Sequence, residues 1–368
     1  MRNSIGHDIV LTLFGESHSD MIGAVLDGLP AGIEIDNGFI ESQLARRRPQ
    51  GSKETARVEM DNYKIVSGVF NGFTTGEPLC ILMENTNTMS KDYEKTRALA
   101  RPSHADYVSH IVHNGYEDYR GGGHFSGRLT APIVALGAIC QKMLENIGIY
   151  VGTHILSCGK VSDRNFSGDS SVLENEIKNV NSKQLPVLNF IDEQIENEIA
   201  AVRAEKDSIG GVIQTAIVGL PVGVGEPWFG SLEGVLANAM LSIGGIKGIE
   251  FGLGFGFGAP GCTGKSANDE FYSTEDGRVM TYTNNNGGIN GGYSNGMPVV
   301  FNCAVKPTPS IASAQRTINM ETGENEIIEI VGRHDPAIIR RVCIVACSLT
   351  CIVLCDMLKT KFSNNIFK

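Results

Sequence analysis

Five short clusters of polar residues combine histidine or arginine with glycine, serine or proline. They lie at residues 14–18 (Phe-Gly-Glu-Ser-His), 46–49 (Arg-Arg-Arg-Pro), 101–107 (Arg-Pro-Ser-His-Ala-Asp-Tyr), 120–128 (Arg-Gly-Gly-Gly-His-Phe-Ser-Gly-Arg) and 332–336 (Gly-Arg-His-Asp-Pro). Arginine binds phosphate and carboxylate groups through paired N–H donors, and histidine exchanges protons near neutral pH. The clusters predict an enzyme that handles an anionic small molecule.

The clusters also coincide with the ends of predicted elements. His18 follows an apolar run of strand length, and His104 precedes a predicted helix. Free N–H groups at helix starts favour anions. Each cluster alone has a plain structural explanation, such as a solvated helix end or a loose glycine loop, so the prediction depends on their occurring together.

Hydrophobic periodicity predicts the elements that position these clusters. Apolar runs bounded by turn residues predict strands at residues 9–14, 22–26, 65–70, 78–83, 211–218 and 298–305. Helical spacing predicts helices at residues 39–47, 105–113, 128–146, 192–206, 232–243 and 336–358. Strands and helices come in pairs, which favours layers of an α+β fold over a doubly wound parallel sheet.

The chain is expected to form a single large domain over residues 1–368, because no linker and no internal repeat divides it. Residues 160–184 are predicted to be a polar insertion. Residues 281–296, which are rich in Asn and Gly, are predicted to be a functional loop.

Composition limits the partners. The chain has 31 Lys and Arg against 41 Asp and Glu, a formal charge of −10, which argues against nucleic-acid binding. The longest uncharged apolar run, residues 342–355, is shorter than the roughly 20 residues that span a bilayer. We therefore expect a cytoplasmic protein with no membrane partner.

Four cysteines recur every fourth residue, at Cys343, Cys347, Cys351 and Cys355. On a helix they would spread over about 18 Å, which is too far for them to surround one metal ion. We expect them to pack along a helix face, and we expect no metal site.

Two further motifs keep other functions open. Residues 259–266 (Ala-Pro-Gly-Cys-Thr-Gly-Lys-Ser) nearly match a phosphate-binding P-loop, although the polar, turn-rich residues 268–277 argue against the helix that such a loop opens. Residues 256–261 match a dinucleotide fingerprint without a clear βαβ unit. A P-loop phosphotransferase and a non-catalytic anion-binding protein remain alternatives.

In their order along the chain, the polar clusters closely resemble those of the chorismate synthase family. The matching runs are residues 14–18, 46–49, 67–70, 74–76, 101–107, 120–123, 225–227, 306–308, 316–319 and 332–336. The resemblance implies a layered β-α-β sandwich of the α+β class, assembled as a homotetramer.

The same resemblance implies a reaction. A carbon–oxygen lyase would eliminate phosphate from 5-enolpyruvylshikimate 3-phosphate in a 1,4-anti sense to give chorismate, the last step of the shikimate pathway to aromatic amino acids. It would require reduced FMN without net redox change. NADPH is a possible reductant, and the absence of a visible additional domain favours an external source of electrons.

Roles carried over from the family fall on named residues. The catalytic set would be His18, His104 and Asp335, supported by Ser17 and Ser126. FMN contacts would fall on His124, Phe125, Ser126, Gly244, Gly245, Gly291, Lys306, Pro307, Thr308, Pro309, Ser310 and Arg333. Substrate or NADP contacts would fall on Arg47, Arg48, Lys53 and Arg128.

The chain departs from the family pattern in two flavin segments. Residues 124–130 read His-Phe-Ser-Gly-Arg-Leu-Thr where the family has Arg-Ser-Ser-Ala-Arg-Glu-Thr, and residues 242–248 read Ser-Ile-Gly-Gly-Ile-Lys-Gly where it has Ser-Ile-Asn-Ala-Val-Lys-Gly. At position 124 a fixed cation becomes a titratable histidine. We therefore expect FMN affinity to fall as the pH rises from about 5.5 to 8.

Overall fold

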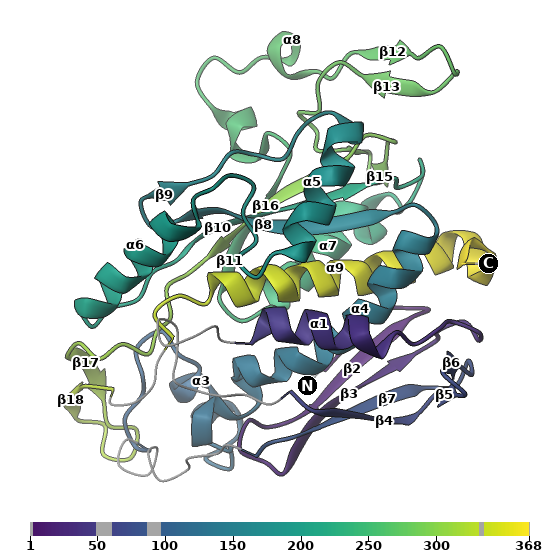
Figure 1. Ribbon diagram of the computed structural model, residues 1–368. Helices are drawn as coiled ribbons and strands as arrows, with labels where there is room; N and C mark the ends of the chain where they lie inside the picture. The colour runs from purple at the N-terminus through teal and green to yellow at the C-terminus, as the bar shows by residue number, and fades with distance from the viewer. Residues whose placement is uncertain (1–2, 49–60, 87–96, 331–334, 368) are drawn as a thin grey trace.

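Two five-stranded antiparallel sheets enclose a layer of helices (Figure 1). The computed structural model describes residues 3–48, 61–86, 97–330 and 335–367. The first sheet has the order β1 (Ser4–Ile5), β2 (Val10–Gly15), β3 (Met21–Asp27), β7 (Leu79–Glu84) and β4 (Tyr63–Ser67). The second has the order β11 (Ile246–Phe251), β16 (Val299–Val305), β10 (Gly211–Val218), β8 (Tyr150–Cys158) and β9 (Val161–Ser162).

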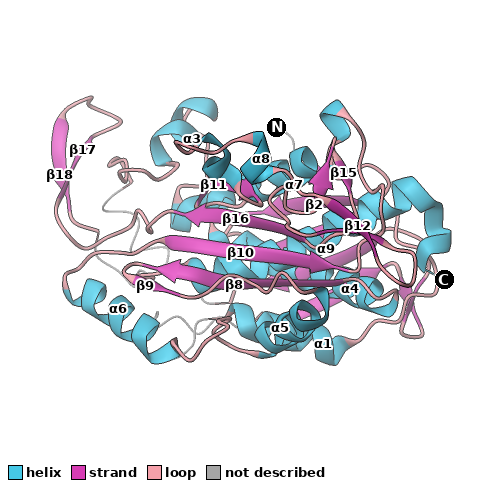
Figure 2. Cartoon of the chain, turned by 90° about the horizontal axis from the view of Figure 1, so that it is seen from above, coloured by secondary structure: helices cyan, strands magenta, loops and turns pink. Residues whose placement is uncertain are grey.

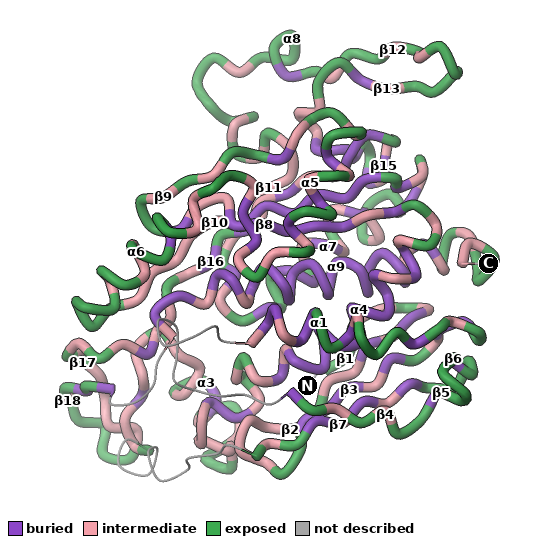
Figure 3. The backbone as a smooth tube through the Cα atoms, viewed as in Figure 1, coloured by how far each residue is buried: buried purple, intermediate pink, exposed green. Residues whose placement is uncertain are grey.

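Helices α1 (Asn37–Arg47), α4 (Thr130–Asn146) and α9 (Ile339–Phe362) lie between the sheets. In Figure 2 the second sheet is seen from above, with α4 and α9 beneath it. One cluster of buried side chains runs from Ile22 of the first sheet through Leu136 and Val345 of the helices to Ile213 of the second sheet. Figure 3 shows this burial concentrated in the middle of the molecule. The predicted layered α+β sandwich is confirmed.

The remaining elements surround these layers. The other helices are α3 (Asp106–Val112), α5 (Ser170–Ser182), α6 (Asp192–Ala204), α7 (Leu232–Ser242) and α8 (Gly264–Ala267). The other strands are β5 (Val69–Phe70), β6 (Phe73–Thr74), β12 (Phe271–Ser273), β13 (Val279–Thr281), β14 (Ile289–Asn290), β15 (Tyr293–Ser294), β17 (Gln315–Ile318) and β18 (Asn325–Ile328). Short 3₁₀ turns are η1 (Arg120–Phe125), η2 (Gly127–Leu129), η3 (Trp228–Gly230), η4 (Gly254–Gly258) and η5 (Ser363–Phe367).

The central helix α9 carries the predicted apolar run and the four spaced cysteines, all of which are buried. The segment Ile339–Phe367 is long and apolar enough to cross a membrane, with a mean hydropathy of 2.1 in its most apolar window. However, 94% of that window is buried inside the protein. The helix is apolar because the second sheet and the helices α1, α4 and α7 pack around it, and it is longer than the 14-residue run considered from the sequence.

The start of α9 differs from the prediction. The helix begins at Ile339, and its N-cap residue Ile338 makes no side-chain cap hydrogen bond. Asp335 instead accepts a long hydrogen bond, 3.4 Å, from the backbone N–H of Ala337. Residues 335–338 therefore form a turn before the helix.

The predicted polar insertion at residues 160–184 is wrong for its second half. This half forms α5, which packs against β8 and β10. Leu173, Ile177 and Val180 are buried beneath the helix, while its other residues are mostly polar. The Asn- and Gly-rich residues 281–296 include the hairpin of β14 and β15.

Candidate active site

The site is built around a glycine loop that touches two histidines. Gly121, Gly122 and Gly123 of η1 have φ angles of 62°, 96° and 52°, a region that favours glycine. A Cβ atom on Gly121 would stand 2.6 Å from ring atoms Cδ2 and Nε2 of His18. A Cβ atom on Gly122 would stand 3.2 Å from Cε1 of His104. Neighbouring glycines thus bring the two predicted histidines to one loop.

The connection between β2 and β3 carries Ser17 and His18 to this loop. The Ser17 hydroxyl donates to the carbonyl oxygen of Arg120 at 3.2 Å, and its backbone N–H donates to the carbonyl oxygen of Gly123 at 3.1 Å. His124 Nδ1 lies 2.8 Å from the carbonyl oxygen of Gly15, which makes Nδ1 the donor. These contacts fix the strand end against the glycine loop.

His104 is oriented by an ion-paired carboxylate. Its Nδ1 lies 2.7 Å from Asp106 Oδ1, and the two Asp106 oxygens accept hydrogen bonds of 2.7 Å from Nε and Nη2 of Arg101. Burial opposes ionisation of Asp106, but the hydrogen bonds from Arg101 and His104 outweigh it and hold the pKa of Asp106 well below its usual value. With Nδ1 engaged, Nε2 of His104 is the ring nitrogen that faces Gly122.

A pocket lies between the His104 turn and the glycine loop, lined in part by Arg101, His104, Gly122 and Phe125. Phe125 is 51% exposed, so about half of this residue is available for contact. The pocket therefore combines an apolar ring with cationic and titratable groups.

Several residues predicted to bind FMN gather beside His104. The Lys306 Nζ donates to the carbonyl oxygen of Ser103 at 2.7 Å, and the Lys306 N–H donates to the carbonyl oxygen of Gly245 at 2.9 Å. Burial, followed by the nearby Lys247, lowers the pKa of Lys306. In the part of the chain that the structure describes, no atom lies within 4 Å of a Cβ built on Gly244. This neighbourhood has open space next to a cation.

The turn before α9 reaches the same neighbourhood. A Cβ on Gly245 would stand 2.9 Å from Cδ1 of Ile338, three residues after Asp335. The Asp335 carboxylate forms an ion pair of 3.3 Å with Arg341 Nε. The structure thus brings the Asp335 turn next to Gly245, which in turn adjoins Lys306.

Residues 306–310 leave the second sheet after β16. The hydroxyl oxygen of Thr308 is buried and has no hydrogen-bond partner among the described residues, although the Thr308 carbonyl oxygen accepts from Ser208 at 2.6 Å. Pro307 is exposed, Pro309 is half-buried and Ser310 is buried. Burying a hydroxyl without a hydrogen-bond partner costs free energy, and a bound ligand can remove this cost by supplying the missing hydrogen bond. Thr308 therefore fits a ligand that brings hydrogen-bonding atoms.

Gly291 does not join this group within one chain. It lies in the β14–β15 hairpin, where the neighbouring Gly292 carbonyl accepts from Leu232 N–H at the start of α7. Gly244 and Gly245 follow the other end of α7, whose eleven residues rise about 16 Å. Lys53 and Arg333, also predicted from the sequence, lie outside the described residues.

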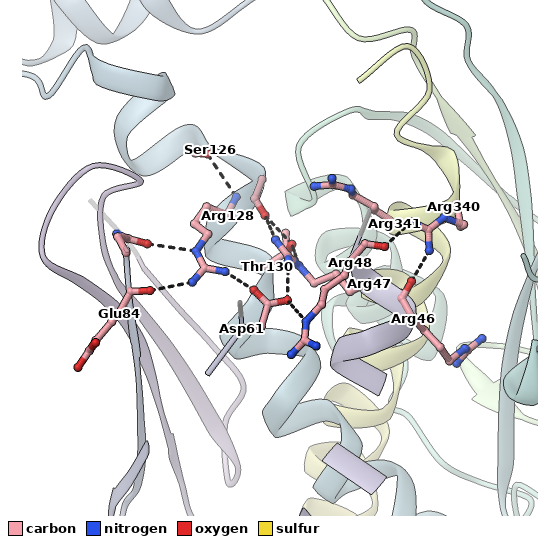
Figure 4. Close-up of polar contacts among 12 residues, drawn as sticks. Arg46, Arg47, Arg48, Asp61, Glu84, Ser126, Arg128, Thr130, Arg340 and Arg341 are labelled. Carbon is pink, nitrogen blue, oxygen red and sulfur yellow. Dashed lines mark hydrogen bonds and ion pairs between the residues drawn. The ribbon is translucent and has the colours of Figure 1, made fainter. Parts of the chain in front are cut away.

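The predicted anion-binding arginines converge on a carboxylate that the sequence did not single out (Figure 4). Arg47 Nη1 lies 3.2 Å and Arg48 Nε 3.6 Å from Asp61 Oδ2, and Arg128 Nη1 donates to Asp61 Oδ1. We call these four residues the Asp61 cluster. Asp61 stands alone in the sequence, two residues before a strand, and no motif marks it.

Asn85 connects the Asp61 cluster to the histidine loop. Its side-chain oxygen accepts from Arg128 Nε at 3.1 Å, and its amide donates to the carbonyl oxygens of Glu16 and Ser19 at 3.0 and 2.8 Å. Those two residues flank Ser17 and His18. Ser126, at the end of the glycine loop, accepts from the Arg128 N–H at 3.3 Å. Arginines and histidines therefore form one connected site.

The P-loop alternative lacks its structural context. The segment around Lys265 opens α8, a helix of four residues, instead of a helix long enough to hold a nucleotide phosphate. α8 lies at one end of the molecule in Figure 1.

Comparison with known proteins agrees with the fold and site. The family model described as chorismate synthase matches residues 9–358. A chorismate synthase of Methanocella arvoryzae is 42% identical over 359 residues, covering 97% of this chain and 94% of its own. One of Dehalococcoides mccartyi is 43% identical over 360 residues, covering 97% and 96%. A crystal structure of chorismate synthase is 28% identical, with a TM-score of 0.75 over 97% of this chain and 93% of its own.

The layered fold and the site of histidines, glycines and arginines define an enzyme that acts on an anionic small molecule. The chain belongs to the chorismate synthase family. It therefore converts 5-enolpyruvylshikimate 3-phosphate to chorismate with loss of phosphate, a lyase reaction of aromatic amino acid biosynthesis. The P-loop phosphotransferase is not supported.

Proposed function

We propose that this reaction takes place at the glycine loop, with His18 and His104 as its proton-handling groups and reduced FMN as its cofactor. The observation that carries the proposal is the contact of both imidazoles with consecutive glycines, Gly121 and Gly122. Because these residues have no side chains, the backbone of the loop can approach both rings closely.

The residues fit a flavin. Open space beside Gly244, the half-exposed Phe125 ring, the Lys306 cation and the unpartnered Thr308 hydroxyl suit a flat ring that carries a phosphate. When bound, reduced FMN would supply electron density to the substrate transiently and recover it. We assign its contacts to these residues together with His124, Ser126, Gly245, Pro307, Pro309 and Ser310. Gly291, which lies apart from them within one chain, and Arg333, which lies outside the described residues, remain predictions from the sequence.

Protein groups would manage charge and protons. Loss of phosphate builds negative charge on the leaving group, which His18 would quench with a proton. Arg47, Arg48 and Arg128 would hold the anionic groups of the substrate. His104, held by Asp106, would keep a proton next to the cofactor. Asp335 would remove the ring C–H proton, with Ser17 and Ser126 as supporting hydroxyls.

An anaerobic assay tests this proposal. Wild-type protein with dithionite-reduced FMN and 5-enolpyruvylshikimate 3-phosphate is expected to release chorismate and phosphate in equal amounts, followed by absorbance and a phosphate assay. His18→Ala and His104→Ala should lower kcat by about 10²-fold or more. His110→Ala is the matched control, because His110 lies on α3 and pairs with Glu117. Equal rates in all three variants would contradict the proposal.

We further propose that the enzyme acts in the cytoplasm as a homotetramer of single-domain chains and receives its electrons from an external reductant. Large exposed rings such as Trp228, Phe229 and Phe255 support an assembly. Light scattering tests the tetramer. Aerobic turnover with NADPH and FMN alone would contradict the external source.

A further inference from the structure

We propose that Asp61 is a positioning residue that holds Arg47, Arg48 and Arg128 in the arrangement that receives the anionic groups of the substrate. This inference rests on the proposed function, since it takes these arginines to be substrate contacts. Asp61 would not touch the substrate itself.

The geometry of the Asp61 cluster supports this role. The Asp61 side chain is completely buried, and both of its oxygens are used: Oδ1 by Arg128, and Oδ2 by Arg47 and Arg48. The three arginine side chains differ in exposure, at 1% for Arg47, 10% for Arg128 and 32% for Arg48. Asp61 thus lies at the buried end of the cluster, and Arg48 is the member most exposed to solvent.

Two of the three guanidiniums, those of Arg47 and Arg128, have a second anchor on a different element. Arg47 also donates to the Thr130 hydroxyl and the Gly127 carbonyl oxygen, both at 3.0 Å. Arg128 also donates to the Glu84 carbonyl oxygen at the end of β7, at 3.1 Å. Figure 4 shows the Arg128 side chain between Asp61 and Glu84. One carboxylate therefore joins the end of α1, the start of α4 and the first sheet.

The backbone of Arg48 is fixed from the opposite side. Arg340 of α9 donates from Nη1 to the carbonyl oxygen of Arg46 and from Nη2 to that of Arg48. The end of α1 is therefore held in place by the central helix, and only the side-chain directions remain to be set. Asp61 sets them.

The charges of the Asp61 cluster explain why its three arginines need a carboxylate between them. Three guanidiniums and one carboxylate leave a net charge of +2, which suits a substrate that carries one phosphate and two carboxylates. Without Asp61 the three cations would repel one another at short range in a partly buried site. They would spread apart, and the paired N–H donors would lose their common direction.

Two models make opposite predictions for Asp61→Asn. If Asp61 contributes only its charge, removing a negative group beside an anion site strengthens substrate binding. If Asp61 positions the arginines, binding weakens although the site becomes more positive. The sign of the change in affinity therefore distinguishes the models.

The experiment compares Asp61→Asn and Asp61→Glu with wild type in the full chain. The Kd for 5-enolpyruvylshikimate 3-phosphate is measured by calorimetry, and KM and kcat by the anaerobic assay. We expect the Kd and KM of Asp61→Asn to rise about tenfold or more, and those of Asp61→Glu to rise several-fold at unchanged net charge. Asp163→Asn, which alters another fully buried carboxylate next to His154, should keep the wild-type Kd.

Tighter or unchanged binding in Asp61→Asn would overturn the positioning role. If Asp61→Asn does not fold, Asp61→Glu decides, and a Kd within twofold of wild type overturns it. Failure of the proposed function is distinguishable, because His18→Ala and His104→Ala would then keep the wild-type rate, while the calorimetric comparison still reports on the arginines.

Discussion

Replacing Gly121 by alanine tests the central geometry of the active site. The new Cβ would stand 2.6 Å from two ring atoms of His18 and 2.7 Å from the Ser17 hydroxyl, whereas ordinary contacts lie at 3.4–4 Å. The ring must therefore retreat by about 1 Å, and a displacement of that size costs about 10²-fold in rate. We expect kcat of Gly121→Ala to fall by about two orders of magnitude.

The same substitution also carries a backbone cost. Gly121 has a φ of 62°, where an L side chain costs roughly 1–2 kcal/mol. Gly148, after α4, provides the matched control because its φ is 78° and no atom of the described residues lies within 4 Å of its built Cβ. Gly148→Ala should lose similar stability and keep full activity.

The assay combines anaerobic turnover with urea unfolding of wild type and both variants. A Gly121→Ala variant that lost stability but kept kcat within threefold of wild type would refute the reasoning, because His18 would then tolerate displacement. A Gly148→Ala variant as inactive as Gly121→Ala would instead assign the effect to lost stability.

Three further predictions follow from the electrostatics. The pKa of Asp106 is lower in the folded than in the unfolded state, so ionised Asp106 stabilises the fold fully above the ordinary pKa of 3.8, and this stabilisation is lost as the pH falls toward the folded-state pKa. Asp106→Asn should therefore be less stable than wild type at pH 7, and its stability should depend less steeply on pH in acid unfolding. Acid-unfolding curves that match those of wild type would contradict this. Burial lowers the pKa of His154 from 6.5 to about 4, so its neutral form stabilises the fold above pH 6.5 and this effect is lost toward pH 4. Between these pH values the free energy of unfolding, measured with urea, should fall by about 3 kcal/mol more in wild type than in His154→Gln. Equal losses in the two proteins would argue against this. His124→Arg, which places a permanent cation at the proposed flavin site, should bind FMN more tightly than wild type, measured by quenching of flavin fluorescence, and equal affinity would refute the role of His124.

The layered fold could be predicted because burial of apolar faces determines it. Strand β8 was missed because its buried stretch contains polar residues that pair across the sheet. Thr153 and Thr215 share a hydrogen bond of 2.9 Å, and His154 lies beside Gln214. These partners are distant in sequence, so an apolar pattern cannot reveal them.

The helix α5 was also missed, although its signal was present. Leu173, Ile177 and Val180 have helical spacing and are buried, but the surrounding polar residues made the segment resemble an insertion. A narrow apolar stripe is enough to cover the outer face of a sheet that already has its core on the other side.

The residues of the candidate site could also be predicted only in part from the sequence. His18 and His104 could be predicted because each stands in a motif at the end of an element. Asp61 could not, since its importance comes from three arginines that the fold brings to it from two distant helix ends. Sequence motifs indicate the groups that carry chemistry more readily than the single carboxylate that orients them.

The position of α9 at the end of the chain has a consequence for biosynthesis. Every strand of both sheets precedes this helix in sequence, and chains leave the ribosome from the N-terminus. While α9 is still missing, the inner face of the second sheet and the helices α1 and α4 lack their shared partner. The nascent polypeptide must therefore delay its final collapse, shielded by chaperones or by transient local contacts, until translation has delivered the segment that joins its two halves.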